Sequence, residues 1–278
     1  MHILADIGGT KMRIAGSQGF TTFSEPIILN TPRSYDEGIK AVADVMKTVA
    51  NGQKVQKIVI GRRGIIAHDK QSVLQDRSFP DWAQKPLVAD VSQALKADSV
   101  HLENDMELVG LGEAVHGAGE GVPIVVYITV STGVGGSRIV DGRIDRFSQG
   151  FEPGGQYISM DAMLSVEEMV SGAAVQKRFG VHPKELGKDN PVWEELARIL
   201  AFGVHNSILH WSPDRVVLGG SMFNEIGISV ERVAAHVKDI MRKFPEVPEI
   251  VHASLGDLGG LWGGLALLKQ EADPKATP

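Results

Sequence analysis

The sequence predicts an α/β protein, because segments with the apolar pattern of strands alternate with segments of helical period along its 278 residues. An internal match supports this class: residues 3–14 and residues 128–139 both read as a strand, a Gly-rich turn and a second strand. The chain also has 32 glycines, whereas an average chain of this length has about 20. About a dozen glycines therefore need a structural or functional reason.

The first half of the chain predicts strands and helices in a regular order. The opening apolar run and the run after the first Gly-rich turn read as a hairpin. The next helix is closed by Asn51 and Gly52. We expect strands at residues 2–5, 12–16, 57–60 and 99–102, and helices at residues 35–49, 86–96 and 106–116.

A linker is expected at Gly117 to Pro123, where three glycines and a proline separate a helix from the most hydrophobic strand. Beyond it, Asn190 is the expected N-cap of a helix with Pro191 at its first position. We expect strands at residues 125–129, 138–140, 215–218 and 249–253, helices at 166–178, 191–210, 229–243 and 258–268, and a frayed polar tail at 271–278. The predicted domains are residues 1–117 completed by a C-terminal helix at 258–270, and residues 118–257.

Composition excludes several classes of function. The chain has no Cys, so it has no disulfide, no cysteine-ligated metal and no thiol nucleophile. Its net charge of −6 argues against electrostatic binding of nucleic acid or anionic membrane. The longest apolar stretch is about half of a membrane span, and the first residues lack a basic signal region. We expect a cytoplasmic protein that binds small molecules.

Two Gly-rich turns are candidate phosphate sites. In the first, Asp6 precedes Gly8, Gly9, Thr10 and Lys11, and the turn lies between two strands, which excludes a Walker A loop or a dinucleotide fingerprint. Backbone N–H groups of such a turn can converge on an anion, although a plain hairpin turn explains the same glycines. The second turn, residues 131–137, holds three glycines and three hydroxyl side chains. Together the two turns are typical of polyphosphate binding.

The pair Asn104-Asp105 follows a predicted strand, and ligands of open α/β sheets bind at carboxyl ends of strands. A capping box with Asn104 as N-cap and Glu107 three residues on explains the same pattern. Asp105 becomes a candidate general base because phosphoryl transfer to a hydroxyl needs a proton acceptor.

Other candidates are weaker alone. The pair Gly219-Gly220 ends a strand where a ring or ribose could approach, and Glu152, Gln156 and Glu167 supply groups suited to a polyhydroxylated ligand. The nine histidines include no His-x-x-x-His pair, which argues against a histidine metal site.

In this order the motifs resemble those of ROK-type sugar kinases, which share the two-lobed actin-like ATPase (ribonuclease H-like) fold with hexokinases. Further matches are Gly61 to Ile66 with the family's Gly-x-x-Gly-Pro-Val, Ser78 to Trp82 with Asn-Leu-Pro-Gly-Trp, Glu167 to Gly172 with Glu-x-x-x-Ser-Gly, and Leu258 to Gly264 with the closing Gly-rich helix. The resemblance implies mixed sheets flanked by helices, with the active site in the cleft between the lobes.

The resemblance also implies roles for individual residues. Asp105 would be the general base for transfer of the terminal phosphoryl of ATP to a hexose hydroxyl, and Asp6 would hold Mg²⁺ through a water. The substrate-binding residues would be Gly64, Ser78, Asn104, Asp105, Glu152, Gly155, Gln156 and Glu167, and the nucleotide- and phosphate-binding residues Gly8, Gly9, Thr10, Lys11, Thr132, Gly133, Gly219, Gly220 and Ser221. Polyphosphate is an alternative donor, and a homodimer is an assembly common among such kinases.

Three departures from the family pattern leave the sugar open. The zinc motif before Glu167 is replaced by a segment without Cys, so no zinc is expected. Gly155 stands where the family has a sugar-binding His, so that contact is missing unless Gln156 reaches the same sugar hydroxyl. Ser78 stands in place of the family's Asn. A sensor of sugar or nucleotide that has lost turnover is therefore the main alternative. A transcription repressor and an ATPase acting on a protein partner fit the sequence less well.

Overall fold

The computed structural model describes residues 1–272, and its chain contacts divide it into two units, each with its own five-stranded sheet. The first unit contains residues 1–115, 146–150 and the C-terminal segment from residue 257, and the second contains residues 116–145 and 151–256. Part of the expected frayed tail, residues 273–278, lies outside the described residues. Residue Glu271 lies in the last helix, where its carboxylate pairs with Lys57 at 3.0 Å and His101 at 2.8 Å, so the expectation of a frayed end is wrong for this residue.

The sheet of the first unit has the order β3-β2-β1-β4-β7. Strand β2 is antiparallel to β1, and β1, β4 and β7 are parallel neighbours. Its strands are β1 (His2–Ile7), β2 (Lys11–Ser17), β3 (Ile27–Asn30), β4 (Lys57–Arg62) and β7 (Ser99–Asn104), with a separate small pair, β5 (Ile65–Ile66) and β6 (Val73–Gln75).

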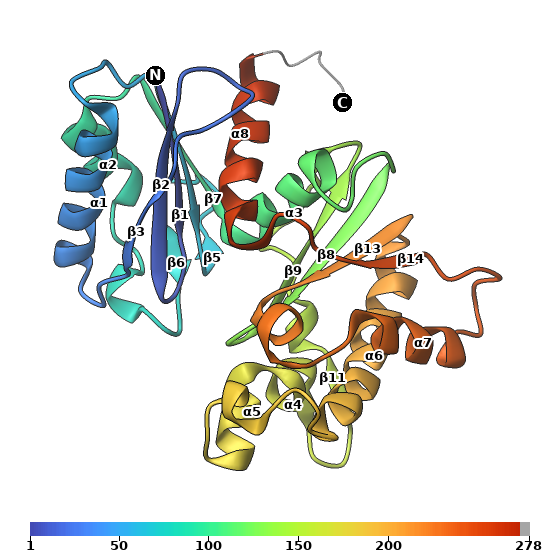
Figure 1. Cartoon of the computed structure of the whole chain (residues 1–278). Helices are drawn as coiled ribbons and strands as arrows, with labels where there is room; N and C mark the ends of the chain where they lie inside the picture. Colours follow the sequence, from blue (N-terminus) through green and yellow to red (C-terminus); the bar gives the residue numbers. More distant parts are fainter. Residues whose placement is uncertain (273–278) are drawn as a thin grey trace. The chain divides into compact units, whose positions relative to one another are not determined.

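Helices cover both faces of this sheet (Figure 1). The buried stripe Val42 and Met46 of α1 packs with the sheet residues Ile3, Ile14 and Ile58 in one apolar core. The helices are α1 (Tyr35–Ala50), α2 (Leu87–Leu95), α3 (Asp105–His116) and α8 (Gly259–Ala272), with the short turns η1 (Pro80–Trp82) and η5 (Gly256–Leu258).

The second unit repeats this plan with the order β10-β9-β8-β13-β14. As in the first unit, the opening strand pairs antiparallel with the next one and parallel with a later one. This sheet consists of β8 (Ile124–Val130), β9 (Val134–Val140), β10 (Arg143–Ile144), β13 (Arg215–Gly219) and β14 (Glu249–His252), and a separate pair is formed by β11 (Tyr157–Ser159) and β12 (Leu164–Ser165).

A long helix, α6, forms the centre of the second core. Its residues Leu196, Leu200, Val204 and Ile208 recur every four positions, as one helix face requires, and all are buried. The other elements are η2 (Pro153–Gly155), α4 (Val166–Val170), α5 (Gly172–Phe179), η3 (Pro183–Leu186), α6 (Val192–Trp211), η4 (Met222–Ile226) and α7 (Val230–Ile240).

Two predicted helix details change in the structure. The single helix expected at residues 166–178 is wrong, because Ser171 adopts an extended ψ of 158° and separates α4 from α5. At α6 the assigned cap is Pro191, but the side chain of Asn190 accepts a hydrogen bond from the N–H of Val192 at 3.0 Å, as an N-cap does.

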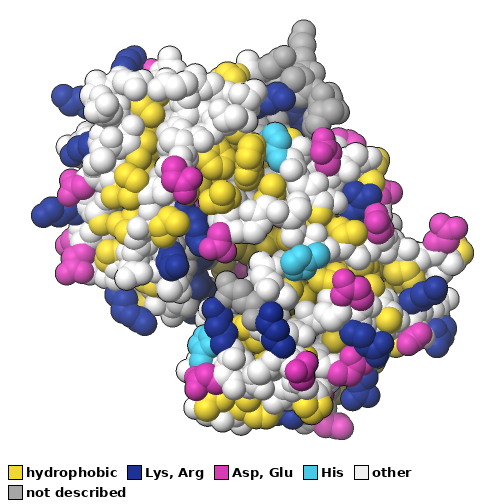
Figure 2. Space-filling view, viewed as in Figure 1, with side chains coloured by type: hydrophobic (Ala, Val, Ile, Leu, Met, Phe, Trp, Pro, Cys, Tyr) yellow, Lys and Arg dark blue, Asp and Glu magenta, His cyan; other side chains and the backbone are white. Residues whose placement is uncertain are grey.

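The described helices include none with the length and apolar character that crossing a membrane requires. On the face drawn in Figure 2, acidic and basic side chains are interspersed.

Candidate functional site

In the first unit, three parallel strands end beside one another. The register aligns Ile7 of β1 with Arg62 of β4, and Arg62 with Asn104 of β7. Asp6 lies one position before the end of β1, and Asp105 begins α3 directly after β7. The sheet therefore brings together the first Gly-rich turn, Asp6 and Asp105, three features that the sequence suggested separately.

Asn104 holds the backbone around Asp105. Its Oδ1 accepts hydrogen bonds from the N–H groups of Met106 at 2.8 Å and Glu107 at 3.4 Å, and its Nδ2 donates to the carbonyl of Gly64 at 2.9 Å. The capping alternative from the sequence is therefore compatible with a site role. The same amide fixes the start of α3 and ties it to the loop at Gly64.

Burial raises the pKa values of both carboxylates in this region. The pKa of Asp105 is raised to about 6 by desolvation, although the charges of Arg63 and Arg62 act in the opposite direction. Desolvation also raises the pKa of Asp6 to about 7, and the nearby charge of Asp105 adds to the effect. A carboxyl group with a pKa near 6 can accept a proton and release it again at neutral pH.

We expect Asp105 to make stability depend on pH. The pKa of Asp105 is about 6 in the folded chain and 3.8 in the unfolded chain, so its protonation stabilises the fold. This stabilisation is complete below about pH 4 and is lost as the pH rises through 6. The loss amounts to at most about 3 kcal/mol. Urea unfolding without divalent cations should show Asp105→Asn as more stable than wild type at pH 8 and equally stable near pH 4. A difference that does not change with pH would contradict the assignment.

The first Gly-rich turn leaves polar groups available to solvent. The N–H of Gly8 donates to the carbonyl of Lys11 at 3.1 Å, and the hydroxyl of Thr31 donates to the carbonyl of Gly8 at 2.8 Å. The side chains of Thr10 and Lys11 are exposed. The turn is thus fixed by its own carbonyls, while its hydroxyl and ammonium donors face outward.

Sequence reasoning missed the arginine pair at the end of β4. Arg62 is fully buried, lies 2.9 Å from Asp76 and stacks over the rings of Trp82 and Phe79 at 4.8 and 5.3 Å. Arg63 lies 3.5 Å from the same Asp76 and also reaches the first Gly-rich turn, since a Cβ on Gly9 would lie 2.5 Å from its Nη1. Two consecutive arginines directly after a buried strand are unusual and could have signalled this pair.

The loop of Gly64 and the segment of Ser78 are joined through Asp76. Gly64 has a φ of +103°, and a Cβ there would lie 2.5 Å from the carbonyl of Gln75, so only glycine fits. Oδ1 of Asp76 accepts from the N–H groups of Ser78 at 2.9 Å and Phe79 at 3.1 Å. These two predicted substrate-binding segments are therefore brought together.

In the second unit, Glu167 supports the second Gly-rich turn. Its Oε2 accepts from the N–H of Val134 at 2.8 Å, and a Cβ on Gly133 would lie 2.6 Å from the same oxygen. The break between α4 and α5 serves the same turn, because the N–H groups of Gly172 and Ala173 donate to its carbonyls at residues 131 and 132. The carboxylate predicted to bind sugar thus contacts the turn predicted to bind phosphate.

The segment Gly219 to Ser221 joins the same group of residues. Gly220 has a φ of +100° and lies so close to the end of β8 that a Cβ would be 2.4 Å from the carbonyl of Val130. The hydroxyl groups of Ser221 and Ser131 are 3.1 Å apart. The predicted adenosine and phosphate segments are therefore neighbours in this unit.

The segment from Glu152 to Gln156 has two different environments. The side-chain amide of Gln156 donates to the carbonyls of Pro153 and Gly203 at 2.9 and 3.4 Å and to the hydroxyl of Ser207 at 3.2 Å. Its N–H groups are therefore occupied within the unit. Gly155 is exposed, and a Cβ there would meet no atom within 4 Å.

The residues of the first unit fit Mg²⁺ held mainly by substrate. Mg²⁺ in phosphate sites is bound by one or two carboxylates together with phosphates and water, and the carboxylate of Asp6 comes just before the first Gly-rich turn. No cluster of three His, Asp or Glu suited to a metal was found among the described residues. In place of the cysteine zinc motif, which this chain lacks, stands the small pair β11 and β12.

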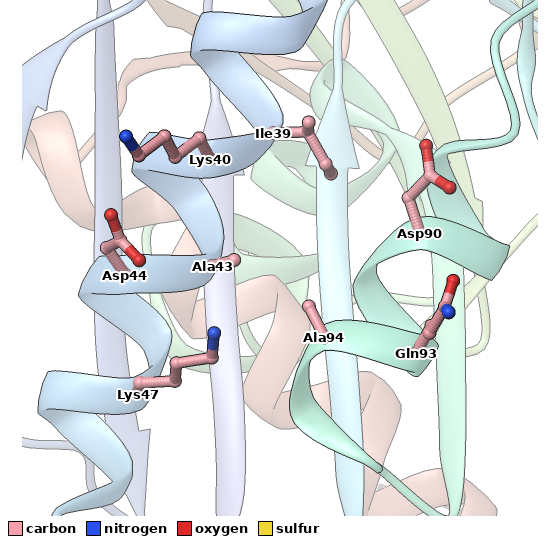
Figure 3. Close-up of a pocket in the computed structure, with 8 residues that line it drawn as sticks. All are labelled: Ile39, Lys40, Ala43, Asp44, Lys47, Asp90, Gln93 and Ala94. Atoms are coloured by element: carbon pink, nitrogen blue, oxygen red, sulfur yellow. The ribbon is translucent and has the colours of Figure 1, made fainter.

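A groove of about 320 Å³ between α1 and α2 contains none of the predicted site residues (Figure 3). Lys40, Asp44 and Lys47 of α1 and Asp90 of α2 lie along it. The hydroxyl of Tyr35 donates to Asp90 at 2.6 Å, so this carboxylate has a structural partner.

Comparisons with known proteins cover nearly the whole chain. The family model described as "ROK family" matches residues 3–271. A fructokinase of Pediococcus pentosaceus is 27% identical over 94% of this chain and 95% of its own length, and an N-acetyl-D-glucosamine kinase of Citrobacter koseri is 27% identical over 96% and 99%. A ROK family glucokinase of Streptomyces griseus, solved with glucose and AMPPNP, matches with a TM-score of 0.82 at 23% identity, covering 97% of this chain and 99% of that one. This match agrees with the predicted actin-like ATPase fold of mixed sheets and helices.

Proposed function

The chain belongs to the ROK family, and from this premise we propose that it transfers the terminal phosphoryl group of ATP to a hydroxyl of a hexose or hexose derivative. Its curated relatives include kinases of fructose and of N-acetyl-D-glucosamine. The observation that carries the proposal is Asp105, a buried carboxylate at the end of β7, in the same unit as a Gly-rich turn.

In the proposed reaction, Asp105 takes the proton of the acceptor hydroxyl. The hydroxyl oxygen forms a bond to the terminal phosphorus, the bond from that phosphorus to its bridging oxygen breaks, and the electron pair leaves on ADP. Because desolvation raises the pKa of Asp105 to about 6, its ionised form at pH 7 is a stronger base than an exposed aspartate. Asn104 supports this role because its amide fixes the start of α3.

The remaining groups are proposed to bind the donor. Backbone N–H groups and outward donors at Gly8 to Lys11, and the turn at Thr132 and Gly133 with Gly219 to Ser221, would bind phosphates and nucleoside. Asp6 would hold Mg²⁺ through a water, and the ion would neutralise part of the phosphate charge. Sugar hydroxyls would be bound at Gly64, Ser78, Asn104, Glu152 and Glu167.

Gly155 offers a way to test sugar preference. Its position is exposed, its backbone has no positive φ, and an added Cβ meets no atom within 4 Å. We expect Gly155→His to fold like wild type and to change the ratio of kcat/KM between hexoses and N-acetylhexosamines by about 10-fold or more, as one added polar contact can. Gly155→Ala is the control and should leave the ratio within about 2-fold. Equal ratios in the histidine variant and wild type would show that this position does not bind sugar.

The proposed function is tested by measuring ADP release with a panel of glucose, fructose, mannose, N-acetylglucosamine and N-acetylmannosamine, with ATP and Mg²⁺. Turnover that needs one of these sugars would support the kinase. Polyphosphate in place of ATP, with sugar phosphate measured directly, separates the two donors. Sugar or nucleotide binding without turnover across the panel would instead support the sensor, which the missing histidine and the occupied side-chain N–H groups of Gln156 favour.

A further inference from the structure

We propose that Arg63 is a catalytic residue that binds the phosphoryl group during its transfer, an inference that rests on the proposed kinase function. The resemblance of the loop Gly61 to Ile66 gives a role to Gly64 but none to Arg63. In the structure, the guanidinium of Arg63 lies directly against the first Gly-rich turn, since a Cβ on Gly9 would be only 2.5 Å from Nη1. Glycine at position 9 therefore leaves the space that the arginine uses.

The donors of Arg63 are available for a ligand. Its ion pair is a contact of Nε with Oδ1 of Asp76 at 3.5 Å, which is too long for a hydrogen bond. Its Nη atoms donate no hydrogen bond to any group of residues 1–272. The side chain is 37% exposed. An arginine in this state presents a planar fork of N–H donors, which matches the oxygens of a phosphoryl group.

Asp76 is shared between Arg63 and Arg62. Asp76 lies closer to Arg62, at 2.9 Å, and its other oxygen accepts two backbone N–H groups from residues 78 and 79. The buried carboxylate of Asp76 thus faces two arginines, and the buried Arg62 is nearer to it than the exposed Arg63. Asp105 also interacts electrostatically with both arginines, so two carboxylates face two guanidinium groups, and that of Arg63 is the exposed one that an anion can reach.

Arg63 and the proposed base follow neighbouring strand ends, because Arg62 of β4 pairs with Asn104 of β7 in the sheet register. Among the charges around Asp105, that of Arg63 has the largest effect in lowering the pKa of the carboxyl. The phosphoryl group passes from a donor bound at the turn to an oxygen whose proton goes to Asp105. A cation between the first Gly-rich turn and Asp105 can stabilise the negative charge on the three equatorial oxygens of the transition state. No atom is transferred to or from Arg63.

The test compares Arg63→Gln and Arg63→Lys with Arg77→Gln, a matched control that removes an exposed arginine from the same loop region. We expect Arg63→Gln to lower kcat by about 10²–10³-fold, with the KM values for ATP and sugar within about 3-fold of wild type. The kcat of Arg63→Lys should lie between those of Arg63→Gln and wild type, because an ammonium keeps the charge but lacks the planar fork. Arg77→Gln should stay within about 2-fold. An Arg63→Gln variant that keeps more than a third of wild-type kcat would overturn the proposal.

A second measurement separates this proposal from a structural role and from the proposed function. ADP with aluminium fluoride, titrated in the presence of each panel sugar, imitates the transferring phosphoryl and needs no turnover. We expect Arg63→Gln to bind ADP as wild type does but to lose at least about 10-fold in affinity for the fluoride complex. Equal loss for both ligands, or a melting temperature lowered with no selective loss, would assign Arg63 to structure and refute the inference. A wild type that binds the complex but phosphorylates no sugar would refute the kinase alone.

Discussion

Replacing Asp105 by Asn is expected to lower kcat by about 10²–10⁴-fold, the usual contribution of a general base. Asparagine keeps the size of the side chain and its place at the start of α3, but it cannot take the hydroxyl proton. Sugar binding, measured by calorimetry without ATP, should stay within a few-fold of wild type. The measurement of turnover is single-turnover formation of sugar phosphate with the sugar that the panel identifies.

Glu103 provides the matched control for Asp105. It lies two positions earlier, is also a buried carboxylate, and forms an ion pair with Lys70. Glu103→Gln should leave kcat within about 3-fold, because this carboxylate precedes the end of β7 and has a partner of its own. If Asp105→Asn kept more than a tenth of the wild-type rate, the assignment of the base would be wrong.

The largest effect on stability is expected from Gly263→Ala in α8. A Cβ at this position would lie 1.7 Å from the carbonyl oxygen of Leu108 in α3, an overlap that only a shift of one helix backbone can relieve. Gly112 of α3 makes the reciprocal contact, since its Cβ would lie 2.4 Å from the carbonyl of Gly259. We expect a loss of about 3 kcal/mol or more in the free energy of unfolding, and a melting temperature lower by roughly 5–10 °C.

Gly264→Ala tests whether the effect is specific to the contact. The next residue of the same helix would place its Cβ 3.2 Å from a methyl group of Leu4, which can move. Alanine also favours the helix by about 1 kcal/mol over glycine. This variant should therefore unfold within about 1 kcal/mol of wild type. Similar losses in both variants would show that helix packing, rather than the backbone contact, dominates.

The alternation of strands and helices could be predicted from the sequence because apolar period is a local signal. The family and its fold were predicted from the resemblance of the motifs to those of ROK-type sugar kinases. Short strands without such signals were missed, among them the exposed edge strand β3 and the pair β11 and β12. Ser171 was misassigned to a helix interior because the partner that stabilises the break, the carbonyl of Ser131, lies 40 positions earlier in the chain.

Most of the predicted site residues lie on turns or at strand ends, while Glu167 lies in α4, and their partners could not be read from the sequence. Nothing local indicates that Glu167 contacts the turn at Gly133, or that a side-chain N–H of Gln156 donates to Ser207. The contacts of Arg62 and Arg63 with Asp76, and of Arg63 with the turn at Gly9, depend on strand register and on burial. Those properties arise only when distant segments pack.

The place of α8 has a consequence for how the protein is made. This helix is the last described element of the chain, yet it packs on β1 and β4, and Gly260 lies against Asp6. During synthesis, the face of the first sheet that α8 covers stays without this helix until the second unit has been translated. The second unit, whose sheet strands come from one continuous stretch of about 130 residues, can fold before the first is complete. The first unit can therefore be completed only after the second has been translated, and Asp6 gains its neighbour Gly260 from a segment about 250 positions later in the chain.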